Sequence, residues 1–77
     1  MHHSQKNLTN LKTGDSARVK ALLATGGIRR RLMDLGLVEG TTVKCVQESP
    51  SGDPVAYGIR GAIIALRRED AGTILVS

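Results

Sequence analysis

The residues of this chain best suited to chemistry are three consecutive arginines, Arg29, Arg30 and Arg31. Clustered arginines bind phosphate groups, so the run raises the possibility of nucleic-acid recognition. On a helical wheel, however, Arg29 and Arg31 flank an apolar stripe on opposite sides, while Arg30 points to solvent. Because the three side chains spread around the helix, they form no single basic face. The pattern therefore favours a helix that covers the core over a nucleic-acid helix.

Histidine and cysteine, the usual ligands of transition metals, occur only as His2, His3 and Cys45. A terminal amine followed by His3 can bind Cu(II) or Ni(II) in square-planar geometry, although such residues are more typical of a mobile tail or of cloning remnants. Cys45 alternates with Val43 in a predicted strand, which favours packing over redox or metal chemistry. A single cysteine forms no intrachain disulfide and indicates a reducing compartment. The sequence predicts no metal site and no cofactor.

Catalytic groupings are missing from the sequence. The histidines stand only at the N-terminus, no Walker-type loop occurs, and the seven acidic residues are scattered. Gly26 and Gly27 could bind an anion through backbone N–H groups at a helix start, but a sharp turn between strand and helix also accounts for them. Because no nucleophile has a base beside it, the sequence predicts a protein that is not an enzyme and has no catalytic residue.

Composition limits the possible partners. The 77 residues carry a formal net charge of +4, which is compatible with nucleic acid, an acidic protein or a membrane surface. Tyr57 is the only aromatic residue, and a single ring builds no stacking platform for single-stranded nucleic acid, so nucleic acid is disfavoured. The polar N-terminus resembles no signal peptide, and no apolar run is long enough to span a bilayer. We expect a cytoplasmic protein without direct membrane insertion.

One short helix positions the arginines. Ile28, Leu32 and Leu35 fall on one arc at spacings i, i+4 and i+7, which predicts a buried stripe. Thr25 is suited to the N-cap, and Gly36 to the left-handed residue that ends many helices.

The residues outside that stripe are candidates for contact with a partner. Arg29, Arg30 and Met33 are predicted to face solvent and are assigned to partner binding as a hypothesis.

Five stretches have the composition of short β-strands: 16–23, 41–48, 55–60, 62–66 and 73–76. In the first, Ala17, Val19, Ala21 and Leu23 alternate with polar residues and are predicted to be buried. The continuous apolar run 62–66 predicts burial on both faces. Residues 67–72 are typical of one helical turn.

Short strands and tight turns favour an all-β fold with one short helix, a small five-stranded β-barrel that closes on itself. The predicted organisation is a disordered polar tail at 1–7 and one domain at 8–77.

Six short motifs, in order from Leu8 to Val76, resemble a known family. They are Leu11 with Gly14-Asp15, Arg30-Arg31-Leu32 with Leu35-Gly36-Leu37, Glu39-Gly40-Thr41 with Val43, Pro50 with Gly52-Asp53-Pro54, Gly61 with Ala65-Leu66-Arg67, and Ala71 with Ile74 and Val76. The chain resembles the ferrous iron transport protein A (FeoA) family. The positions taken as its structural motif are Gly14, Ile28, Leu32, Leu35, Gly36, Gly40, Val43, Pro54, Gly61 and Leu66.

The resemblance implies an SH3-like barrel and a role in iron homeostasis. It implies a small cytosolic accessory protein that docks on the membrane ferrous iron transporter FeoB and modulates its transport or GTPase activity, with no small-molecule substrate. A similar SH3-like domain forms the C-terminal part of some metal-dependent repressors. Since the chain begins with its own Met1 and no helix-turn-helix precedes the domain, we expect a stand-alone FeoA. A nucleic-acid-binding domain and a metal-regulator domain stay as alternatives.

Overall fold

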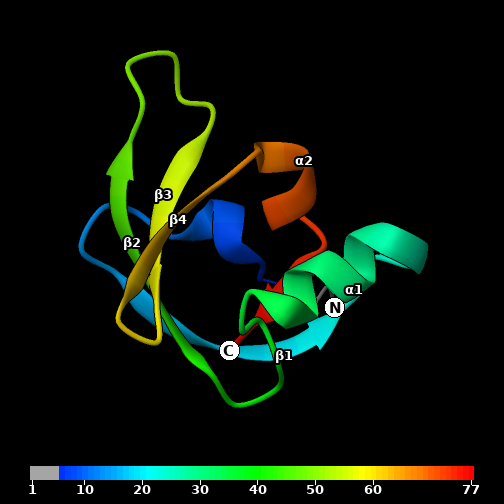
Figure 1. Cartoon of the computed structure of the whole chain (residues 1–77). Coiled ribbons are helices and arrows are strands. Elements are labelled where there is room, and N and C mark those ends of the chain that lie inside the picture. The colour runs from blue at the N-terminus through cyan, green and yellow to red at the C-terminus, as the bar shows by residue number, and fades with distance from the viewer. Residues whose placement is uncertain (1–5) are drawn as a thin grey trace, which may run out of the picture.

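The computed structural model describes residues 6–77, and Figure 1 shows a strongly curved sheet with short helices at its sides. The elements in chain order are η1 (Leu8–Asn10), β1 (Ser16–Leu22), α1 (Gly26–Asp34), β2 (Thr42–Glu48), β3 (Val55–Ile59), β4 (Ala62–Leu66), α2 (Arg68–Ala71) and β5 (Ile74–Val76). The strand order is β4-β3-β2-β1-β5, and every neighbouring pair is antiparallel. The predicted mostly-β fold with five strands is confirmed. The predicted helical turn after β4 is α2.

The core lies on the concave side of the sheet. Val43 and Cys45 have no exposed surface, as their alternation in β2 predicts. Leu8 of η1 is equally buried, and Leu37 enters the same core from the segment that follows α1. Tyr57 of β3 is 1% exposed, and its hydroxyl group donates a hydrogen bond of 3.3 Å to the carbonyl oxygen of Leu8. This bond fastens η1 to the sheet.

Tyr57 makes the stability of the fold sensitive to alkaline pH. Burial raises the pKa of its hydroxyl group from 10.0 to about 12. The unfolded chain therefore loses the phenolic proton first, and the stability present below pH 10 declines as pH rises towards the folded-state pKa. We expect ionisation of Tyr57 alone to lower the free energy of unfolding by about 2 kcal/mol as the pH rises from the unfolded-state pKa of 10.0 to the folded-state pKa of about 12. Urea denaturation across this range measures the loss, and tyrosinate absorbance reports this residue alone.

Tyr57→Phe is the matched control, because it removes the ionisable group and keeps the ring. Every other group is the same in both proteins, so its contribution to the pH dependence cancels in the comparison. The difference in pH dependence between them is therefore the contribution of Tyr57. Equal pH dependence in the two proteins would contradict the prediction.

The predicted alternation in β1 is correct only for its first half. Ala17 and Val19 are buried, but Ala21 is exposed and Leu23 is 58% exposed. The register between β1 and β5 shifts between Val19 and Ala21, which marks a bulge. An extra residue in one strand exchanges the faces of every residue beyond it. As a result Leu22, rather than its neighbours, packs against the core.

The prediction that β4 is buried on both faces is wrong. Ala62 and Ala65 are exposed, Ile63 is 69% exposed, and only Leu66 is fully buried. The cause is topological, because β4 pairs with β3 alone and forms one end of the sheet. A continuous apolar run in this chain therefore marks an end strand, not a central one.

The N-terminal boundary of the domain lies earlier than predicted. The carbonyl oxygen of Lys6 accepts a hydrogen bond of 2.9 Å from the backbone N–H of Val76, and Asn7 forms a bridge to Leu75. The Asn7 side chain also accepts a hydrogen bond from the backbone N–H of Thr9 and so caps η1. Lys6 and Asn7, which fall within the tail predicted at 1–7, therefore belong to the fold, and residues 1–5 of that tail lie outside the described residues.

Candidate partner-binding surface

Helix α1 has little contact with the rest of the molecule. Leu32 is its only fully buried residue, and Leu35, just beyond the helix, is partly buried against the core. The predicted burial of Ile28 is wrong, since its side chain is 43% exposed. In Figure 1 the N-terminal end of α1 projects beyond the sheet, which agrees with the exposure of the first turn. The stripe predicted from the sequence is thus buried only over its C-terminal half.

Glycines set both ends of α1. Gly26 begins the helix with φ of +64°, and Thr25 occupies the N-cap position without the capping hydrogen bond predicted for its side chain. At the other end Gly36 has φ of +103°, and its N–H bonds to the carbonyl oxygen of Met33. The N–H of Leu37 donates a hydrogen bond of 3.0 Å to the carbonyl oxygen of Leu32, which completes a Schellman motif. Gly36 is thus the left-handed helix stop that the sequence predicts.

The three candidate contact residues lie together on α1. Arg29, Arg30 and Met33 line one shallow hollow, with Gly26 and Asp34 at its edges. Both arginines are exposed, and Met33 is 43% exposed. Arg29 is also tethered, because its Nη1 donates a hydrogen bond of 3.0 Å to the carbonyl oxygen of Leu22. We call these three residues the α1 surface.

A groove between α1 and β1 adjoins the α1 surface. Leu22, Met33 and Leu37 provide apolar lining, and Lys20 and Arg29 add positive charge. The other lining residues are Val19, Ala21, Val38 and Glu39. The sequence interpretation missed Leu22 and Leu37, because the bulge in β1 and the turn at Gly36 decide which side chains meet there. Periodicity within one element does not predict which side chains of β1, α1 and the segment after α1 come together.

The first turn of α1 is positively charged, although Asp34 also lines the hollow and Glu39 the groove. The helix N-terminus carries the positive end of the backbone dipole, and no acidic residue occupies the first turn. Arg29 and Arg30 add two full charges in the N-terminal half, and both are exposed. An arrangement of this kind attracts negatively charged surfaces and raises their association rate. Apolar surface for an anchoring side chain lies directly beside it in the groove.

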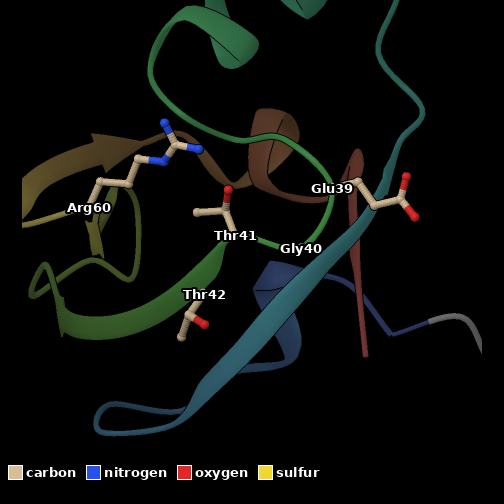
Figure 2. Close-up of a pocket in the computed structure, with 5 residues that line it drawn as sticks. All are labelled: Glu39, Gly40, Thr41, Thr42 and Arg60. Carbon is tan, nitrogen blue, oxygen red and sulfur yellow. The ribbon is translucent and has the colours of Figure 1, made fainter.

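A second hollow lies where the chain enters β2, and Figure 2 shows its lining. The Arg60 guanidinium group extends towards Thr41, while the Glu39 carboxylate points away on the far side. Arg60 has φ of +51° and Gly61 φ of +82°, as a two-residue type I′ turn between β3 and β4 requires. This hollow offers hydroxyl and guanidinium groups for polar contacts. The sequence interpretation missed Arg60, because only Gly61 signals a turn there and arginine rarely adopts the positive φ that the first position of a type I′ turn requires.

The remaining candidate for reactive chemistry, Cys45, is inside the core. Burial raises the pKa of its thiol, so the group stays protonated and packs as a small apolar side chain. Among residues 6–77, no three histidine, cysteine, aspartate or glutamate side chains gather as a metal site would need. His2 and His3 lie outside the described residues. Within the same part of the chain, no helix combines the length and apolar character of a membrane crossing.

Comparison with known proteins identifies a family for this chain. The FeoA domain model matches residues 6–77. A Porphyromonas gingivalis fusion protein of Fe(2+) transport protein A and the Fe(2+) transporter FeoB is 42% identical over 69 residues, which are 90% of this chain and 8% of that protein. The chain thus spans a small part of this relative.

Solved structures agree with the family model. The FeoA protein of Chlorobium tepidum has a TM-score of 0.86 and 42% identity over 92% of this chain and 68% of its own. Stenotrophomonas maltophilia FeoA, described as a prokaryotic SH3 domain protein in complex with zinc, has a TM-score of 0.84 and 32% identity over 94% and 89%. The SH3-like fold is therefore confirmed, and the chain belongs to the FeoA domain family.

Proposed function

We propose that this protein is an accessory module of ferrous iron transport that docks through its α1 surface on the cytoplasmic side of a FeoB-type transporter. The observation that carries the proposal is the fusion relative, in which a segment 42% identical to this chain is covalently joined to FeoB. Covalent fusion keeps two partners at high effective concentration, which benefits domains that act together. Docking would alter the transport or the nucleotide turnover of the transporter.

The α1 surface has the physical properties of a docking site. It is exposed and carries two arginines, and its helix is held to the core by the buried Leu32 and by the hydrogen bond from Arg29 to the Leu22 carbonyl oxygen. The adjoining groove can accept an apolar anchor, while Arg29 and Arg30 meet acidic groups around it. Interfaces commonly combine a buried apolar contact with arginines that fix orientation. The expected contact region on the transporter is therefore acidic with a protruding apolar side chain.

Reversing two charges tests the proposal. We expect Arg29→Glu with Arg30→Glu to weaken co-purification with the FeoB of the same organism by at least about tenfold, because attraction becomes repulsion. Circular dichroism should show an unchanged fold, since both side chains are exposed. Met33→Asp should reduce the same binding by removing the apolar contact.

The matched control is Arg18→Glu with Lys44→Glu, which changes the net charge equally on the exposed side of β1 and β2. That control should retain binding. Equal binding by a folded Arg29→Glu/Arg30→Glu protein would exclude the α1 surface. Tight binding of duplex DNA at physiological salt by the unmodified protein would contradict the proposal and favour a nucleic-acid role.

A further inference from the structure

The outer edge of β4 carries unpaired backbone groups. Ile59 and Ala62 flank the two-residue turn and form the hydrogen-bonded pair that closes a type I′ hairpin. Pairs alternate along an antiparallel ladder, so Ile63 and Ala65 direct their N–H and C=O groups away from β3. Among the backbone hydrogen bonds of residues 6–77 outside the regular elements, none reaches these two residues. β4 therefore presents a free edge for a further strand.

This edge lacks the usual protection of an end strand. Natural end strands carry charged residues or proline, which discourage pairing with another chain. No residue of Ala62–Leu66 is charged or a proline, and Ile63 is 69% exposed. Ala65 also borders a shallow hollow whose lining combines Pro50, Pro54 and Ala56 with the polar residues Gln47, Glu48 and Ser49. The free backbone edge is thus continuous with a partly apolar surface.

Charges at both ends of β4 indicate what kind of strand fits. The exposed residues Arg60 on one side and Arg67 and Arg68 on the other enclose the uncharged strand. At the second end the exposed Glu69 follows, and the Asp53 carboxylate accepts a hydrogen bond of 3.0 Å from the backbone N–H of Arg68, so Arg67, next to β4, is the cation that an added strand meets first. A second copy that overlapped β4 fully, with Ile64 opposite Ile64, would place Arg60 of one copy opposite Arg68 of the other. Like charges in opposed positions destabilise strand pairs. A strand with acidic residues at its ends meets the opposite charge instead.

We propose that β4 is a docking edge for an extended segment of a partner protein, apolar in its centre and acidic at both ends. The segment adds to the sheet as a strand, with Ile63 and Ala65 supplying the backbone hydrogen bonds. Recognition of this kind takes affinity from the main chain and specificity from the alternating side chains. The β4 edge and the α1 surface share no residue, so this docking is separate from the function proposed above.

A peptide titration tests the proposal. The probe is a blocked peptide with a Val-Thr-Val-Thr-Val centre and an aspartate at each end, and the control peptide has lysines in place of both aspartates. We expect the acidic peptide to shift the NMR amide signals of Ile63 and Ala65 and to slow their hydrogen exchange, and the basic peptide to bind about tenfold more weakly. Equal binding of the two peptides would overturn the charge assignment, and signal changes confined to α1 would overturn the site.

Variants of the protein locate the binding edge. Ala65→Pro removes an outward N–H that β3 does not use, and Ile63→Lys adds the charge that protects natural end strands. Each should weaken peptide binding by about tenfold, whereas Leu23→Lys, at a similarly exposed apolar residue near α1, should leave it unchanged. Unchanged binding by folded Ile63→Lys would overturn the proposal.

Two further measurements distinguish peptide binding at β4 from binding at the α1 surface and from self-association. Arg29→Glu with Arg30→Glu should retain the peptide, so a failure of α1 docking and a failure of β4 docking are distinguishable. If exchange at Ile63 and Ala65 slows with rising protein concentration in the absence of peptide, a second copy occupies the edge and the proposal is overturned.

Discussion

Leu32→Ala is expected to lower the free energy of unfolding by about 3 kcal/mol, since it deletes a buried leucine and leaves a cavity. Leu32 is 2% exposed and is the only fully buried residue of α1. The effect should therefore be greater locally than globally, with the helix separating from the sheet before the strands open. Urea denaturation measures the global loss, and amide hydrogen exchange in Gly26–Asp34 measures the local one.

Ile28→Ala is the control in the same helix. Its side chain is 43% exposed at the projecting end, so its removal should change the unfolding free energy by less than about 0.5 kcal/mol. Similar losses for the two variants would mean that the first turn of α1 is packed against something in solution. In that case the α1 surface would be less accessible to a partner than its exposure indicates.

Gly36→Ala is expected to cost about 2 to 3 kcal/mol of unfolding free energy, because backbone strain and a steric clash add together. The residue has φ of +103°, which side chains rarely adopt. A Cβ atom would also lie 3.3 Å from Cγ2 of Ile59 and 3.4 Å from Cδ of Arg60. Because Ile59 is fully buried, its side chain has little room to move. Thermal and urea denaturation measure the loss.

Gly14→Ala separates the backbone strain from the clash. Gly14 has a similar φ of +95°, but a Cβ atom there would have no neighbour within 4 Å. It should therefore cost about 1 kcal/mol, the backbone contribution alone. If both variants lost the same free energy, the close approach of Gly36 to β3 would carry no energetic weight. The end of α1 would then be free to shift relative to the sheet.

Most of the fold could be predicted from local chemistry. Turn residues and alternating strands place all five strands within a few residues of their observed bounds, and the helix stop at Gly36 follows from glycine alone. The errors arise where burial depends on a neighbouring element. An apolar run such as 62–66 fits a central strand and an end strand equally well, and only the strand order shows that nothing pairs with its outer edge. The bulge after Val19 is likewise set by pairing with β5.

The candidate site could be predicted in part for the same reason. Helical periodicity correctly places Arg29, Arg30 and Met33 on the exposed side, and their common hollow follows from that geometry. Periodicity does not show how far along the helix the sheet extends beneath it. It therefore also placed Ile28 in the core. The tether from Arg29 to the Leu22 carbonyl group joins two elements, and it could be seen only after folding.

The pairing of Lys6 with Val76 has a consequence for how this domain can be carried within longer polypeptides. Because the chain enters and leaves the fold at one place, a host protein could contain it as an insertion without separating its own flanking segments. A circular permutant that joins these ends through a short linker and opens the 49–54 loop should fold to the same sheet. The fold thus depends less on the order of its segments along the chain than on the contacts between its first and last segments.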